Sequence, residues 1–137
     1  MALYYADASA LVKLVRDEPE SAALRVFIAD ADLASCDLVL AEVPRAIRRA
    51  AALDQRLDLE VLVARAGEVI DSVALVSIDR ALLLAAGALS EPSLRALDAI
   101  HVAAAASLTP IDGFLGYDER QAAAARLAGL RTFAPGL

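Results

Sequence analysis

The order of hydrophobic and polar residues predicts short buried strands that alternate with longer amphipathic helices. Apolar runs of strand length are bounded by Asp, Gly or Pro, and the longer segments repeat apolar residues at helical spacing. Parallel strands need a crossover connection, which is usually a helix, so this alternation predicts a mainly parallel sheet in a three-layer α/β/α sandwich. The predicted strands cover residues 3–6, 33–36, 73–78, 113–117 and 130–133, and the predicted helices cover residues 9–16, 20–30, 37–53, 58–71, 79–88, 94–108 and 119–128.

Three positions carry specific local predictions. Pro44 lies inside the third predicted helix and has no N–H for the carbonyl of Leu40, so we expect a kink or break near Glu42. Asp37 and Asp79 each follow a strand and precede a helix, and we interpret both as N-caps.

Composition limits the class of protein. A chain of 137 residues is expected to form one domain, spanning 1–137, and its 59% hydrophobic content is mostly Ala, Leu and Val with 4% aromatic residues. The longest uncharged run, 99–111, is shorter than the ~18 residues of a membrane span, and no signal peptide is evident at the N-terminus. Cys36 is the only cysteine, which excludes an internal disulfide and favours the cytoplasm. The net charge of −6 argues against a general nucleic-acid binder.

Four carboxylates, Asp7, Glu42, Asp98 and Asp118, lie within or beside strongly apolar segments. Each has an ordinary interpretation when it is taken alone: Asp7 and Asp118 could cap helices, and Glu42 could face solvent. Asp98 is harder to explain, because aspartate is a poor residue inside a helix and its neighbours are apolar.

Together the four acids predict a metal site. Asp7 and Asp118 end predicted strands, and sites in open parallel sheets form at the carboxyl ends of strands. Burying several carboxylates costs several kcal/mol each unless a cation compensates, and Mg2+ prefers oxygen ligands. Such ions most often serve phosphate chemistry, so the pattern predicts a metal-dependent nuclease.

Other polar residues near these acids have two interpretations each. His101 lies one helical turn after Asp98, where it could be a general base or a metal ligand, although a packed histidine bonded through its ring nitrogens is favoured. Ser9 could donate a hydrogen bond to Asp7 or simply start a helix. The arginines after Glu42 could contact RNA, although a solvated face is favoured; they are Arg45, Arg48 and Arg49.

The chain resembles the PIN-domain ribonucleases of the VapC toxin type. The similar segments are YYADASALVKLV (4–15), LAEVPRAIRR (40–49), LDAIHVAAA (97–105) and GYDERQAAAARLAGL (116–130), in the family's order. The resemblance implies a compact α/β/α fold that cleaves RNA phosphodiester bonds with Mg2+ or Mn2+. It also implies that Asp7, Glu42, Asp98 and Asp118 are the catalytic, metal-binding acids. One departure is Gly116, because many relatives carry Ser or Thr two residues before the last acid.

The resemblance also implies a cognate antitoxin that holds the protein inactive. Seven apolar residues of the first two predicted helices could form a groove for an amphipathic partner helix, and the acids could attract an Arg or Lys of that partner. The high hydrophobic content, together with the resemblance, predicts a homodimer. These seven residues are Leu11, Val12, Leu14, Val15, Leu24, Phe27 and Ile28.

Three other classes of protein could explain acids at the ends of parallel strands. A phospho-accepting receiver domain needs a lysine late in the chain, and Lys13 is the only lysine. A phosphatase of the Asp-x-Asp type needs an aspartate where Ser9 stands. A catalytically silent PIN-like module that only binds proteins stays open as the alternative, and a metal-dependent cleavage assay distinguishes it.

Overall fold

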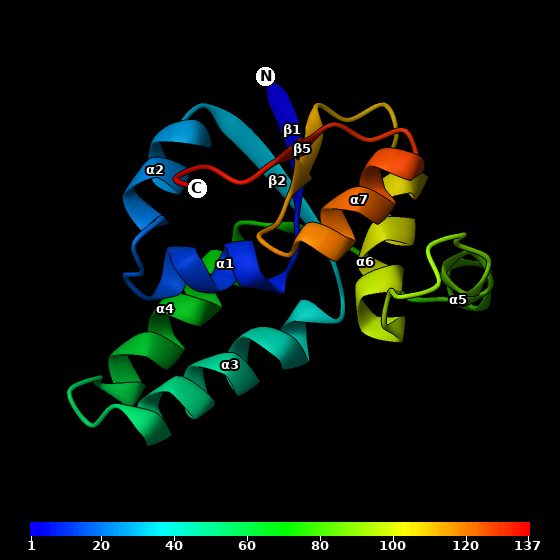
Figure 1. The fold of residues 1–137 in the computed structure, drawn as a ribbon. Helices are drawn as coiled ribbons and strands as arrows, with labels where there is room; N and C mark the ends of the chain where they lie inside the picture. Colours follow the sequence, from blue (N-terminus) through cyan, green and yellow to red (C-terminus); the bar gives the residue numbers. More distant parts are fainter.

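A five-stranded parallel sheet forms the centre of the protein in a computed structural model that describes residues 1–137 (Figure 1). Its strand order is β3-β2-β1-β4-β5, and every neighbouring pair is parallel. The strands are β1 (Ala2–Ala6), β2 (Ala31–Cys36), β3 (Ala74–Val76), β4 (Gly113–Leu115) and β5 (Thr132–Phe133).

Seven helices cover the two faces of the sheet and confirm the predicted three-layer α/β/α arrangement. Helices α1 to α4 pack on one face and α5 to α7 on the other, as Figure 1 shows. The chain winds from β1 outward to β2 and β3, then crosses back to β4 and β5. Because parallel crossovers are right-handed, this reversal of direction moves the helices to the opposite face. The helices are α1 (Ala8–Val15), α2 (Ser21–Phe27), α3 (Val39–Leu53), α4 (Leu59–Asp71), α5 (Arg80–Gly87), α6 (Ala96–Ser107) and α7 (Glu119–Leu127).

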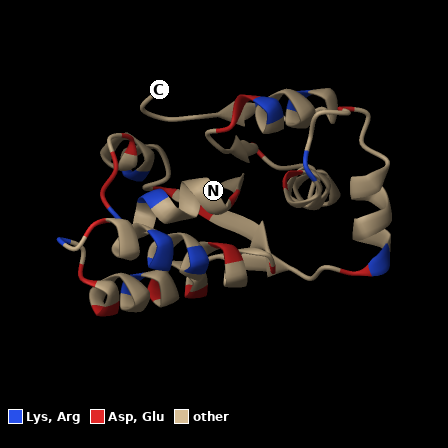
Figure 2. Cartoon of the chain, turned by 60° about the horizontal axis from the view of Figure 1, so that its bottom comes forward, with Lys and Arg blue, Asp and Glu red and all other residues tan.

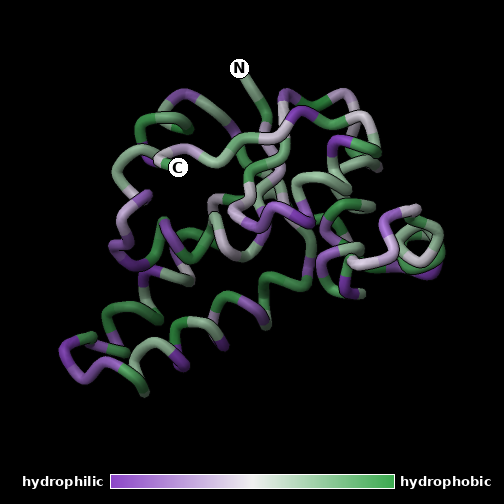
Figure 3. The backbone as a smooth tube through the Cα atoms, in the orientation of Figure 1, coloured by the Kyte–Doolittle hydropathy of each residue, from purple (hydrophilic) through white to green (hydrophobic).

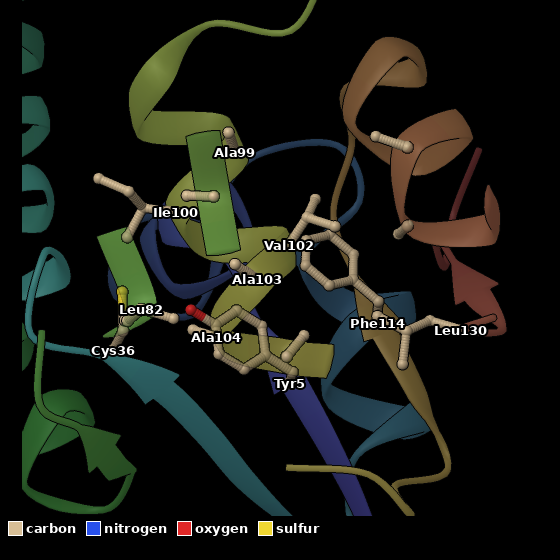
Figure 4. Packing of buried hydrophobic residues seen from close by; sticks show 14 of the residues in the cluster. Tyr5, Cys36, Leu82, Ala99, Ile100, Val102, Ala103, Ala104, Phe114 and Leu130 are labelled. Atoms are coloured by element: carbon tan, nitrogen blue, oxygen red, sulfur yellow. The ribbon is translucent and has the colours of Figure 1, made fainter. Parts of the chain in front are cut away.

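Alternation along β1 divides the core into two clusters. Successive side chains of a strand point to opposite faces, so Tyr5 packs below α6 while Ala6 packs against α1 and α3. The Tyr5 ring stacks on Phe114 with centroids 5.5 Å apart. Small residues of α6, including Ala103 and Ala104, let that helix approach the two aromatic rings closely (Figure 4). These contacts fix the end of β1 and the start of α6 relative to one another.

Two local predictions concern α3: the expected N-cap was wrong, and of the expected kink or break the break is absent. The helix continues through Pro44 without a break, although the carbonyl of Leu40 loses its usual N–H partner. The N-cap is Leu38 rather than Asp37, whose side chain accepts no capping bond. At α5 the prediction is confirmed, because Asp79 accepts a hydrogen bond from the N–H of Leu82 at 2.8 Å.

Hydrophilic residues gather at loops, for example at the outer end of the α3–α4 hairpin (Figure 3). None of the helices combines the length and the apolar character that crossing a lipid bilayer requires.

Candidate active site

The candidate site lies where the winding of the sheet reverses, at the carboxyl ends of β1 and β4. Asp7 directly follows β1, and Asp118 follows β4 after two residues. The two strand ends are tied together by the N–H of Asp7, which donates to the carbonyl of Leu115 at 3.1 Å. Crevices at such a reversal point are the usual ligand sites of open parallel sheets.

All four predicted acids line one cavity of about 320 Å³ at this edge. They come from the end of β1, the first turns of α3 and α6, and the N-cap of α7. The other lining residues are Ala8, Ser9, His101, Tyr117 and Gln121.

Asp7 is the most buried of the four, with 5% of its surface exposed. Its Oδ1 accepts hydrogen bonds from Ser9 Oγ at 2.7 Å and from the N–H of Ala10 at 3.0 Å, so Asp7 also caps α1. Burial raises the pKa of Asp7, and the charge of Glu42 adds to that effect, although the two hydrogen bonds oppose it. The protein therefore destabilises the ionised form of Asp7 unless a cation lies nearby.

Gly116 lies against this carboxylate. A Cβ at Gly116 would stand 2.9 Å from Phe114 Cε1 and 3.1 Å from Asp7 Oδ2. A side chain at position 116 would therefore crowd Asp7.

Glu42 is held by His101, whose Nε2 lies 2.6 Å from Glu42 Oε1. The imidazole is almost fully buried, and its Nδ1 lies 2.8 Å from the hydroxyl of Tyr5 and 3.7 Å from Cys36 Sγ. Burial favours the neutral ring, but hydrogen bonds with Cys36 and Glu42 outweigh it and raise the pKa of His101 to about 10. Both ring nitrogens therefore lie within hydrogen-bonding distance of a partner, Nδ1 beside the Tyr5 hydroxyl and Nε2 beside the Glu42 carboxylate. The structure bears out the favoured interpretation of His101 as a packed residue bonded through both ring nitrogens.

Asp98 and Asp118 both line this cavity and an adjoining one. Burial and the charge of Asp118 raise the pKa of Asp98. Asp118 Oδ1 accepts from the N–H of Gln121 at 3.0 Å and caps α7, as its capping interpretation expected. The side chain of Gln121 does not complete a capping box; its Nε2 lies 3.5 Å from the backbone carbonyl of Asp98.

The donor set suits a hard divalent ion. Each of the four carboxylates keeps at least one oxygen that accepts no hydrogen bond, because the bonds to Asp7, Glu42 and Asp118 all use a single oxygen. Oxygen ligands of this kind are those that Mg2+ and Mn2+ prefer. The four carboxylates do not form a compact cluster of three or more groups that could already hold a metal ion. Their fit to a metal rests on the shared cavity and on the unused oxygens.

Sequence reasoning missed two polar residues of the cavity, Tyr117 and Gln121. The burial of Gln121 depends on the packing of α7 against α6, which the sequence pattern does not reveal. The hydroxyl of Ser9 donates a hydrogen bond to Asp7, which was one of the two interpretations of Ser9.

The arginines that follow Glu42 on α3 are exposed and line none of the described cavities near the acids.

The apolar residues expected to form a partner groove pack mainly inward. Leu11, Val15 and Leu24 are fully buried in the core, so they are not available to a partner. The remaining four are partly buried against the same core; they are Val12, Leu14, Phe27 and Ile28.

Comparison with known proteins identifies the family of this chain. The PIN domain family model matches residues 4–128. The chain is 37% identical to ribonuclease VapC46 of Mycobacterium tuberculosis strain H37Rv, covering 98% of this chain and 99% of the relative. It is 31% identical to ribonuclease VapC47 and 36% identical to ribonuclease VapC35 of Mycobacterium tuberculosis strain CDC 1551, each over 98% of both chains. The chain therefore belongs to the PIN-domain family and, within it, to the VapC ribonucleases.

Proposed function

We propose that this chain is the ribonuclease toxin of a toxin–antitoxin pair and hydrolyses RNA with Mg2+ or Mn2+ held by Asp7, Glu42, Asp98 and Asp118. The observation that carries the proposal is the single cavity that these four acids line, each with an unused oxygen. Relatives that are named ribonucleases and match over 98% of the chain support the reaction. The proposal treats residues 1–137 as one PIN domain.

The chain's own residues would orient the acids for this chemistry. A bound divalent ion lowers the pKa of a coordinated water and offsets negative charge on the phosphate. Ser9 and the Ala10 N–H hold Asp7, and His101 holds Glu42, so the remaining oxygens of both acids keep a set direction. No side chain is placed as a covalent nucleophile, since the Ser9 hydroxyl is bonded to Asp7 and Cys36 is buried. This arrangement supports direct attack by water.

The test compares Asp98→Asn with Asp30→Asn, which removes the same charge from an exposed residue outside the cavity. Total RNA is incubated with each protein in Mn2+, in Mg2+ and after chelation, and the new RNA ends are mapped. We expect cleavage by the wild type and Asp30→Asn only with metal, and a loss of at least 100-fold in Asp98→Asn. Calorimetric titration with Mn2+ should show weaker binding to Asp98→Asn alone. A wild type that binds Mn2+ but cleaves no RNA would support the silent binding module instead.

An antitoxin partner is part of the proposal. The partly buried side chains Val12, Leu14 and Phe27 offer a limited apolar edge, and the acidic cavity would attract an Arg or Lys. Inhibition by the product of the neighbouring gene should then weaken with added salt and with excess Mn2+. Inhibition that is insensitive to both would exclude this charge mechanism.

We also propose a homodimer that acts in the cytoplasm. Leu83 and Leu84 of α5 and Leu97 of α6 are 49%, 68% and 51% exposed on adjacent helices, which supports an apolar interface. The RNA substrate and the single unpaired cysteine support the location. Light scattering at micromolar concentration tests the dimer, and a monomer there would contradict it.

A further inference from the structure

A second cavity of about 270 Å³ adjoins the acidic cavity and shares Asp98 and Asp118 with it. It has one apolar lining residue, and two of its residues are arginines. Ser93 is not free to serve a ligand, because its hydroxyl donates to Glu91 Oε1 at 2.7 Å. The lining residues are Ser93, Leu94, Arg95, Asp98, Asp118 and Arg120.

The two arginines come from the beginnings of two helices. Arg95 is the N-cap residue of α6, and Arg120 is the second residue of α7. Figure 2 shows how the basic and acidic residues are distributed over the helices and loops of the chain. Both side chains are exposed, and neither forms an ion pair or a hydrogen bond within the chain.

Their lack of partners is informative because of where they lie. Arg95 and Asp98 line the same cavity, yet the two side chains form no ion pair. Three arginines elsewhere on the surface do pair with nearby acids, for example Arg126 with Glu119 at 2.7 Å. Two guanidinium groups beside two carboxylates therefore keep their donors available to a ligand.

We propose that this second cavity is a phosphate subsite, where Arg95 and Arg120 bind the RNA backbone next to the bond that is cut. The inference rests on the proposed ribonuclease function. A chain with net charge −6 repels RNA as a whole, so local cations must supply the attraction to phosphate. Guanidinium groups match phosphate oxygens with paired hydrogen bonds. A strand that places one phosphate over the acids would place its neighbour in the adjoining cavity.

The test compares Arg95→Ala and Arg120→Ala with Arg45→Ala and Arg48→Ala. The second pair removes the same charge from exposed arginines of α3 that form no ion pairs and line neither cavity. Binding of a fluorescein-labelled oligouridylate is measured by anisotropy in metal-free buffer over a series of salt concentrations. Each subsite variant should bind about tenfold more weakly and lower the salt slope by about 0.7, the value for one phosphate contact on a single strand. The α3 variants should stay close to the wild type.

Cleavage of total RNA in Mn2+ provides the second readout. The subsite variants should raise KM and leave kcat nearly unchanged, because contacts away from the reacting bond contribute uniform binding. Arg120→Lys should recover the salt slope but only part of the affinity. Equal weakening by both pairs, or an effect of the subsite pair on thermal stability alone, would overturn the subsite. A wild type that cleaves no RNA would instead refute the proposed function.

Discussion

Replacing Asp7 by Asn tests whether this buried carboxylate is kept for a metal or for capping a helix. The Asn side chain is nearly isosteric, and its Oδ1 can still accept from Ser9 and from the N–H of Ala10. The new amide group takes the place of Oδ2, which accepts no hydrogen bond and lies against Gly116. The substitution therefore removes the charge and leaves most of the cap in place.

The magnitude follows from two opposing terms. Two hydrogen bonds change from charge-assisted to neutral, a loss of about 1 kcal/mol each. Relief from burying an ionised carboxylate contributes several kcal/mol in the other direction. The raised pKa of Asp7 sets the sign, because it shows that the folded chain disfavours the charged form. We expect metal-free Asp7→Asn to be more stable than the wild type by about 1–3 kcal/mol.

The assay is thermal unfolding with and without Mn2+. An unfolding entropy of about 2.1 cal/mol/K per residue gives about 290 cal/mol/K for 137 residues, so 1 kcal/mol corresponds to about 3.5 °C. Metal-free Asp7→Asn should therefore melt about 4–10 °C above the wild type. At 100 times its Kd, Mn2+ should stabilise the wild type by about 2.7 kcal/mol and the variant far less, so that the difference narrows or reverses.

The pH dependence has a definite sign. Below the ordinary pKa of 3.8 both the folded and unfolded states carry the proton, and the burial of Asp7 carries no penalty. As pH rises from 3.8 through the raised folded pKa, the wild type loses stability, and above that pKa the loss is complete. The stability advantage of Asp7→Asn should open across this window and stay constant above it. A metal-free variant less stable than the wild type at pH 7 would refute the reasoning and leave Asp7 as a structural cap.

Three further predictions concern neighbouring residues. His101→Phe should weaken Mn2+ binding about 10- to 100-fold in calorimetry, because Glu42 loses the group that orients it, and unchanged affinity would contradict that role. Gly116→Ser should displace the carboxylate of Asp7 and reduce Mn2+ affinity, whereas retained affinity would show that the local packing can yield. Leu11→Ala should lower the free energy of unfolding by about 2–5 kcal/mol in urea titrations, and a smaller loss would mean that the core around α1 closes over the gap.

The sequence predicted the elements well because each apolar pattern matches the packing of its element, and a strand such as β1 is covered on both faces of the sheet. Strands such as β1 are short apolar runs, and helices such as α7 end near a glycine, so the pattern and the packing agree. The start of α3 was misjudged for a physical reason. Asp37 stands where an N-cap is common, but the first turn of the helix begins at Val39 after a turn through Leu38. Pro44 is tolerated because one missing hydrogen bond near the start of a long helix does not break it.

Partners from distant segments could not be predicted in the same way. The environment of His101 is made by Tyr5, Cys36 and Glu42, which lie 96, 65 and 59 residues away along the chain. Their meeting depends on the sheet order, which places β1 between β2 and β4. Burial of Gln121 likewise depends on α7 packing against α6. A single sequence shows which polar residues lie in apolar segments, while the order of the strands determines which of these residues come into contact.

The capping and metal-site interpretations of the acids are compatible, because a carboxylate has two oxygens. Asp7 and Asp118 each use Oδ1 to cap a helix and leave Oδ2 without a hydrogen bond. Glu42 divides its oxygens in the same way, with Oε1 bonded to His101. The hydrogen bonds to one oxygen fix the direction of the second oxygen, so the fold preorganises the carboxylates of Asp7, Glu42 and Asp118. Asp98 is the exception, since both of its oxygens lack such a bond and its pKa is raised by burial and by Asp118. Asp98 therefore has no side-chain hydrogen bond within the chain, and under the proposed function a metal ion would supply its partner.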